Sequence, residues 1–188
     1  MKLAVLKEAG HDEALLGMAL SYAPPGVDLS EWWTPERQAK AALRAGKLAH
    51  RQGGHNKFLE SIQVWILIQA TRGWWSQFDT YRAGVTKQSA STMHMLAKRP
   101  PATEHFHPDT PKAAIEAFST LWHAGGMSID ELKCALPEGY LQERVVCTNY
   151  KALQNMVAQR KDHRLGQWDV FCRRLEAQLN HPGYVFHE

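Results

Sequence analysis

Near the N-terminus, apolar residues recur first at the spacing of a strand and then at the spacing of a helix. The run at positions 3–6 predicts a short strand that ends at Gly10. Apolar residues at positions 15–20 then lie three or four apart, which indicates a helix that begins at His11. Pro24 and Pro25 must end this helix, because proline removes a backbone donor and forces an extended path.

The longest apolar run lies at positions 62–70, where only two glutamines are polar. Its β-branched and aromatic residues predict a central strand that is buried on both faces. Before this run, Thr34 has the character of a helix N-cap and Pro35 that of the first helical residue. A helix is therefore expected from Pro35 to Gly46 or just beyond.

The second half of the chain follows mostly helical patterns. Positions 74–95 are expected to be largely helical, and 111–123 places its apolar residues on one helix face. The remaining expected elements are a short helix capped at Ser128, a short strand at 144–148, and a helix at 150–160 capped by Asn149. This order predicts an α+β fold, with helices packed on a small central sheet, in one domain over residues 1–188.

Composition limits the class of protein. Of 188 residues, 44% are hydrophobic and 22% are charged, which is typical of a globular protein. The net charge of +3 suits an anionic small ligand, whereas a nucleic-acid-binding protein usually has a denser basic cluster. Three cysteines without paired spacing, no signal-peptide core and no apolar run of about 18 residues predict a soluble cytoplasmic protein without a membrane partner.

Polar residues recur at fixed offsets in and just before the expected helix at 150–160. The amides of Asn149 and Asn155 donate and accept hydrogen bonds, and the guanidinium of Arg160 is always charged, so all three suit a nucleotide or flavin. Each also has a structural interpretation: Asn149 as a helix cap, Asn155 as a solvated residue, and Arg160 as favourable charge at a helix C-terminus. The residues alone leave both interpretations open.

The same stretch resembles a motif of the flavin-dependent thymidylate synthases. In that family Thr-Val-Asn-Ala-Arg-Ser-Leu-x-Asn leads to an arginine and then to Gln-Trp-Glu-Ile. Here a lysine stands at the family's first arginine, and Gln167-Trp168-Asp169-Val170 follows one residue later than usual. The matching positions are Asn149, Lys151, Leu153, Asn155 and Arg160. This matched spacing favours the functional interpretation.

A second region is similar to the family's Gly-His-x-Ser-x-Leu-Glu-His, which precedes its central strand. Here the segment is Gly54-His55-Asn56-Lys57-Phe58-Leu59-Glu60-Ser61. His55 and Glu60 keep their spacing, but Ser61 stands where the family has a flavin-contacting histidine. The opening strand and helix, which end in Ser21-Tyr22, also look like those of the family.

The family signature Arg-His-Arg-x-x-Ser-x-Asn-Glu-x-Ser-x-Arg-Tyr is largely rewritten. Gln77 matches the glutamine before it, and Thr80-Tyr81-Arg82 replaces Arg-His-Arg, so only the last arginine is retained. At the far end Ser91-Thr92-Met93-His94 replaces Ser-x-Arg-Tyr. The family serine is then Ser91, with Ser89 as the alternative, and a methionine replaces the arginine that would hold substrate phosphate. The variant resembles that of phage and prophage relatives.

The resemblance implies transfer of a one-carbon unit from methylene-tetrahydrofolate to C5 of a dUMP-like pyrimidine deoxynucleotide, by methylation or hydroxymethylation. FAD is the implied cofactor, NADPH a possible co-substrate, and a homotetramer with shared sites the implied assembly. Arg160 and Ser91 are assigned to catalysis, and Gln77, Ser89 and Arg160 to substrate binding. The residues assigned to the flavin are Asn149, Lys151, Asn155, Arg82, His55 and Ser61. The alternative is an inactive nucleotide-binding relative that acts as a sensor, sponge or assembly protein.

The length of the helix at 150–160 bears on how such a site is built. At a rise of 1.5 Å per residue, Asn149 and Arg160 are roughly 16 Å apart. One small ligand would hardly touch both, so a site assembled between helices or subunits is expected.

Two other patterns receive a structural interpretation. His105-x-His107 with Glu104 and Asp109 nearby suggests a metal site, but a polar loop is favoured because no second ligand cluster follows at defined spacing. No metal is therefore expected. Large aromatic residues are more often core than ligand platforms, so the core is the prediction for Trp65, Trp74, Trp75 and Trp168.

Overall fold

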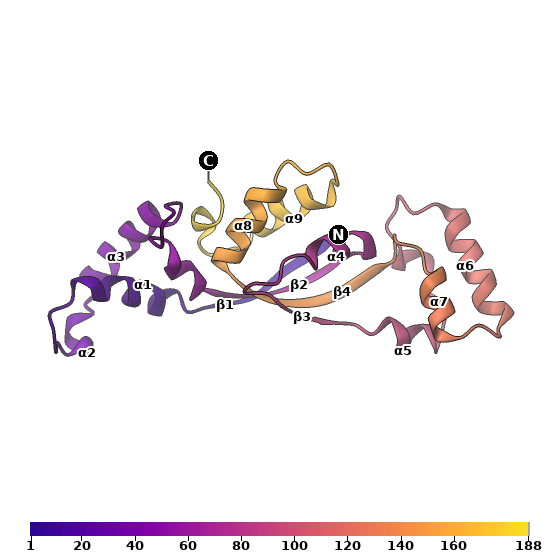
Figure 1. Cartoon of the computed structure of the whole chain (residues 1–188), viewed down its shortest axis with the longest axis horizontal. Helices are drawn as coiled ribbons and strands as arrows, with labels where there is room; N and C mark the ends of the chain where they lie inside the picture. The colour runs from indigo at the N-terminus through magenta and orange to yellow at the C-terminus, as the bar shows by residue number, and fades with distance from the viewer. Residues whose placement is uncertain (188) are drawn as a thin grey trace.

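A sheet of four antiparallel strands lies at the centre of the molecule (Figure 1). The computed structural model describes residues 1–187. In spatial order the strands are β1 (Lys2–Ala9), β2 (Gln63–Thr71), β4 (Leu141–Asn149) and β3 (Thr86–Ser89). β2 and β4 pair along their whole length, from Gln63 opposite Asn149 to Thr71 opposite Leu141. This register extends β4 beyond the strand that was predicted at 144–148.

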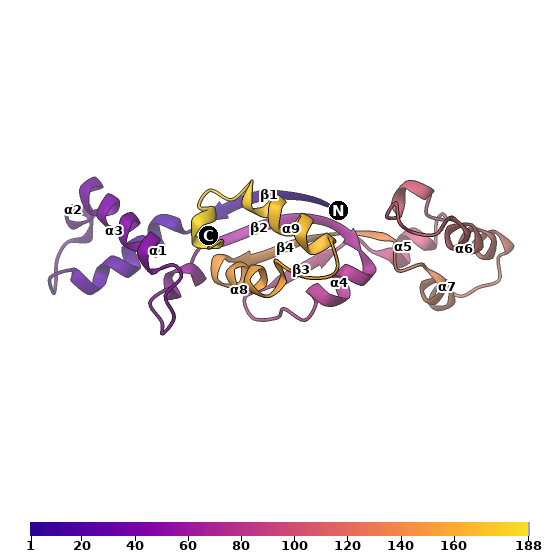
Figure 2. The same ribbon diagram turned by 90° about the horizontal axis from the view of Figure 1, so that it is seen from above.

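Two helices cover one face of this sheet, α8 (Tyr150–Arg160) and α9 (Gln167–Glu176) (Figure 2). Every second side chain of β2 points to them, and each of these side chains is fully buried because apolar helix residues pack against it. The interface is made by Val64, Ile66, Ile68, Leu153, Met156, Trp168, Phe171 and Leu175. The predicted α+β fold with helices on a small sheet is confirmed.

A helical lobe lies at each end of the sheet (Figure 1). The N-terminal lobe contains α1 (His11–Ala19), α2 (Leu29–Trp32) and α3 (Pro35–Leu48). The second lobe, at the other end, contains α5 (Thr92–Leu96), α6 (Lys112–Ala124) and α7 (Ile129–Ala135). The latter has a small core of its own, made by Leu96, Phe106, Phe118, Leu132, Leu136 and Tyr140. Short 3-10 helices are η1 (Leu20–Tyr22), η2 (Lys57–Glu60), η3 (Thr103–His105) and η4 (Pro182–Tyr184).

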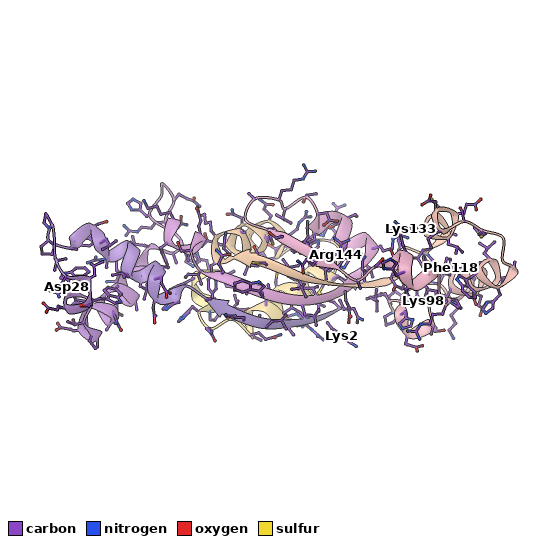
Figure 3. All side chains as sticks on the ribbon, turned by 90° about the horizontal axis from the view of Figure 1, so that it is seen from below. Lys2, Asp28, Lys98, Phe118, Lys133 and Arg144 are labelled. Carbon is purple, nitrogen blue, oxygen red and sulfur yellow. The ribbon has the colours of Figure 1, made fainter. Side chains whose placement is uncertain are left out.

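The second face of the sheet carries no helix among residues 1–187 (Figure 3). On this face the side chains of Gln63, Trp65, Leu67 and Gln69 are only half-buried. The prediction that this strand is buried on both faces is therefore wrong, and so is the assignment of Trp65 to the core. Lys7 covers the ring of Trp65, with its Nζ 5.9 Å from the ring centroid. By contrast, Trp74, Trp75 and Trp168 are core residues, as predicted.

The prediction of a largely helical segment at 74–95 is also wrong. Helix α4 (Arg72–Phe78) ends early, and the chain then turns into the edge strand β3 before α5 begins. The Asp79 carboxylate fixes this turn, because it accepts hydrogen bonds from Arg144 on β4 at 2.9 Å and from Lys87 on β3 at 2.7 Å. Burial opposes ionisation of Asp79, but these two bonds outweigh it and hold its pKa below the ordinary value.

Local capping residues begin three helices as predicted. Thr34 accepts a hydrogen bond from the Arg37 amide at the start of α3, and Ser128 forms a reciprocal capping box with Glu131. Asn149 caps α8, which spans the predicted 150–160. These ends were predictable because each cap depends on residues within one turn.

Acid is expected to destabilise the protein through a stacked histidine pair. The rings of His11 and His181 lie 3.8 Å apart at 11°. Burial, together with the nearby His11, lowers the pKa of His181 below its ordinary value of 6.5. The unfolded chain therefore binds the proton more readily, so the stability that this group contributes above pH 6.5 is lost as the pH falls through its depressed pKa.

Thermal melts at about pH 7.5 and about pH 5.5 test this prediction. The melting temperature should fall by a few degrees on acidification, a modest loss because solvent reaches the half-buried ring. The variant His181→Tyr keeps an aromatic stack but cannot titrate in this range, and it should lose part of that fall. An identical fall in both proteins would contradict the assignment to His181.

Candidate functional site

The two ends of α8 carry different parts of the predicted site. Asn149 caps the start of the helix and Arg160 is its last residue. The separation that was predicted from helix geometry is thus retained, and each end has its own surroundings.

At the end of α8, the Arg160 guanidinium lies among aromatic rings. Its Nε donates to the Tyr81 hydroxyl at 2.8 Å, and its carbon lies 4.9 Å from the Trp168 ring centroid. Among residues 1–187, no carboxylate lies within ion-pair distance of Arg160. The charge is therefore held in place by rings and remains available to an anionic or carbonyl-bearing ligand.

Gln77 is joined to Arg160 through the buried indole between them. The Trp168 Nε1 donates to the Gln77 Oε1 at 2.8 Å, and the same indole contacts the guanidinium. This fixes the orientation of the Gln77 amide and leaves its nitrogen free to donate. Gln77 and Gln167 both line an open hollow of about 660 Å³ at the end of the sheet.

At the start of α8, the Asn149 side chain has a structural task. Its Oδ1 accepts from the Ala152 amide at 2.9 Å, while its Nδ2 faces Gly84. The Tyr150 amide donates to the carbonyl of Ile62 at 3.1 Å, so this helix end lies beside the segment that leads into β2. Ser61 belongs to that segment.

Ser61 and His55 line one hollow on the N-terminal lobe, between α1, α3 and the segment around η2. The hollow has a volume of about 460 Å³, and its lining includes Lys57, Arg44 and Tyr22. His55 and Ser61 are both exposed there. Of the predicted flavin residues, these two are the ones that the fold brings to a common hollow.

The other predicted site residues are dispersed. Ser91 caps α5 by accepting from the His94 amide at 3.3 Å, and Ser89 lies opposite Arg144 on the edge strand. Arg82 and Asn155 are exposed, and Lys151 donates to the buried Gln154 at 3.3 Å. Within one chain the predicted residues therefore lie at several separate places. Their roles in a site stay predictions.

Sequence patterns missed Tyr81, which positions Arg160, and Gln154, which joins α8 to α3 and η4. Tyr81 was noted only as a departure from the family signature, although its hydroxyl binds both Arg160 and Gln159. Gln154 is buried, and its amide nitrogen donates to the carbonyls of Ala49 and Tyr184. A glutamine on the apolar face of a helix was the one available signal for this contact.

Glycine at position 84 is expected to be required beside the Asn149 cap. Gly84 has a φ of +67°, and an added Cβ would lie 2.7 Å from the Asn149 Nδ2. Gly84→Ala should therefore lower the free energy of unfolding by roughly 1–3 kcal/mol through strain and displacement of the cap. Gly126 has a φ of +79° but open space around it, so Gly126→Ala is the matched control for strain alone. Equal losses of unfolding free energy for the two variants in urea denaturation would contradict the contact with Asn149.

The histidines at 105 and 107 take part in local turns. His105 Nδ1 accepts from the Ala102 amide, and His107 Nδ1 accepts from the Asp109 amide. Within residues 1–187 no group of three His, Cys, Asp or Glu side chains is placed to hold a metal ion.

No helix of this part of the chain is both long and apolar enough to span a bilayer.

Solved structures of known function share this fold. Two are crystal structures of the flavin-dependent thymidylate synthase ThyX from Helicobacter pylori with FAD and dUMP. One aligns with 98% of this chain and 98% of its own, with a TM-score of 0.79 and 18% identity. The other covers 100% of this chain and 98% of its own, with the same score and identity.

Sequence comparison adds no closer relative. No protein-family model matches the chain, and no curated protein matches it. At 18% identity the structural likeness shows that the chain has the ThyX fold. What that fold does in this chain depends on the residues of the site.

Proposed function

We propose that the chain is a flavin-dependent thymidylate synthase-like enzyme that transfers a one-carbon unit to C5 of a pyrimidine deoxynucleotide such as dUMP. The observation that carries the proposal is the likeness over 98% of the chain to a structure that holds FAD and dUMP. The uncompensated Arg160 at the end of α8 supports it, because the chemistry needs a fixed positive charge beside the pyrimidine.

The residues around the 460 Å³ hollow fit a flavin nucleotide. Lys57 and His55 supply cationic or donor groups for phosphate, and the Ser61 hydroxyl supplies a neutral donor and acceptor. FAD, when bound, supplies the hydride that reduces the transferred carbon. The protein's part is then to orient the reactants and to place charge.

In this proposal Arg160 stabilises the negative charge that develops on the pyrimidine when C5 becomes a nucleophile. The Tyr81 hydroxyl and the Trp168 ring restrain the guanidinium, so little reorganisation is needed when that charge forms. Gln77 orients the base through its free amide nitrogen, and Ser91 lies close to the substrate. Methylene-tetrahydrofolate donates the carbon, and NADPH is the proposed source of the electrons.

Assembly from several copies of the chain is part of the proposal. Asn149 and Arg160 lie at opposite ends of one helix, and Ser91 caps α5 of the second lobe. A homotetramer would allow a long dinucleotide to contact groups from different subunits, which one chain keeps apart. The sheet face that carries Trp65 offers surface for such contacts.

An inactive nucleotide-binding relative is the second candidate. The observation that favours it is the exposed Met93, at 46% exposure, where the family has a phosphate-holding arginine. Ser91 is also already engaged as a helix cap.

A product assay separates the two candidates. The purified protein is supplied with dUMP, methylene-tetrahydrofolate, FAD and NADPH, and the nucleotides are separated by chromatography. Formation of dTMP or of hydroxymethyl-dUMP is the expected result. Stabilisation by dUMP in a thermal shift without any product would contradict the enzyme and support the inactive relative.

A further inference from the structure

Two neighbouring hollows on the N-terminal lobe share a cation and an aromatic ring. The 460 Å³ hollow described above meets a second one of about 250 Å³, and Arg44 and Tyr22 line both. The second hollow is also lined by Trp32, Arg37 and Lys40. The shared pair therefore stands where a ligand that extends from one hollow to the other would pass.

The Arg44 guanidinium lies directly on the Tyr22 ring, with its carbon 3.9 Å from the ring centroid. The ring is 64% exposed, so the pair is accessible from solvent. Within residues 1–187 no carboxylate forms an ion pair with Arg44 or with Lys57 across the hollow. Arg44 and Lys57 thus line one cavity, and neither is engaged in an ion pair there.

Other charges nearby are weaker candidates for a ligand. Glu13 lines the first hollow and reduces its positive potential, while Lys40 already pairs with Glu36 at 2.7 Å. Arg37 donates to the carbonyl of Trp32 at 2.7 Å. Arg44 is therefore the cation whose planar donor fork remains available at the junction.

We infer that Arg44, stacked on Tyr22, is a diphosphate-binding residue at the junction of these two hollows. The inference rests on the proposed flavin function but concerns a residue outside every motif that suggested it. A guanidinium binds phosphate oxygens in a bidentate manner. The ring beneath it already restricts its orientation, so less conformational entropy is lost on binding. The ligand class is an adenosine diphosphate group, either alone or as part of FAD.

Equilibrium titrations of the full chain with FAD, ADP and riboflavin test this inference. Arg44→Gln should weaken FAD and ADP binding by about tenfold or more, because it removes a charge-assisted bond to phosphate. Riboflavin has no phosphate, so its affinity should be unchanged. Arg44→Lys keeps the charge without the planar fork, so its affinities for FAD and ADP should lie between those of the wild type and of Arg44→Gln. Lys47→Gln, a charge loss on an exposed residue of the same helix, is the control and should leave all affinities within about twofold.

The outcomes distinguish the inference from the flavin proposal. If FAD binds equally to the wild type and to Arg44→Gln, the inference is overturned while the flavin function stands. If ADP binding depends on Arg44 but FAD does not bind, the inference stands and the flavin function fails. If neither binds the wild type, both are overturned. If Lys47→Gln weakened FAD and ADP binding as much as Arg44→Gln does, or if Arg44→Gln weakened riboflavin binding equally, the effect would be a general one of charge or fold. Either result would also overturn the inference.

Discussion

Replacing Arg160 with alanine is expected to abolish nucleotide turnover while leaving the fold intact. The loss should be roughly 10²–10³-fold in kcat, as is typical when one group that stabilises developing charge is removed. The fold should survive because Arg160 lies at the end of α8, is only half-buried, and forms no ion pair within residues 1–187.

Two variants separate the charge of Arg160 from its packing. Arg160→Lys keeps the charge but loses the fork and the flat stacking surface, so it should recover only part of the rate. Tyr81→Phe removes the hydroxyl that accepts from the Arg160 Nε at 2.8 Å and should lower kcat less than Arg160→Ala. Product formation gives the rates and circular dichroism reports the fold. An unchanged rate in Arg160→Ala would remove this residue from the site.

Replacing Trp168 with alanine is expected to cause a large loss of stability. The ring is fully buried and packs against Trp74 and Phe171, with centroids 4.7 and 5.6 Å away. Truncation of a core aromatic residue costs about 3–5 kcal/mol, because it removes apolar burial and leaves a cavity. It also removes the indole donor to Gln77, so the residues around Arg160 should be disordered together.

Comparison with another tryptophan makes this prediction specific. Trp65→Ala is the same change on the half-buried face of the sheet, and it should cost clearly less in urea denaturation. Trp168→Phe keeps a ring and loses the Nε1 donor, so it should lie between the wild type and Trp168→Ala. A smaller loss for Trp168→Ala than for Trp65→Ala would contradict the described core.

The starts of three helices were predictable because their causes are local. Thr34, Ser128 and Asn149 each cap a helix through a bond to a residue three positions away. The strand at the sheet edge was not predictable in this way. Its sequence, Thr86 to Ser89, has no apolar alternation, and only its pairing with β4 makes it a strand.

In the candidate site, too, some features follow from local sequence and others depend on the tertiary fold. Spacing along one helix correctly placed Asn149 and Arg160 at its two ends, but the partner that positions Arg160 is Tyr81, which is 79 residues away in the sequence. Likewise, Arg44 and Lys57 line one hollow because α3 and the segment around η2 lie beside each other in the fold. Such contacts depend on the tertiary fold, so sequence patterns cannot supply them.

A flavin titration tests whether the chain is a flavin-dependent protein. The purified chain is titrated with FAD, and the absorbance and fluorescence of the flavin are followed to saturation with and without dUMP. We expect saturable FAD binding in the micromolar range and a change in the flavin spectrum when dUMP is added. A protein that is colourless when purified and gives no saturable change with FAD would contradict it.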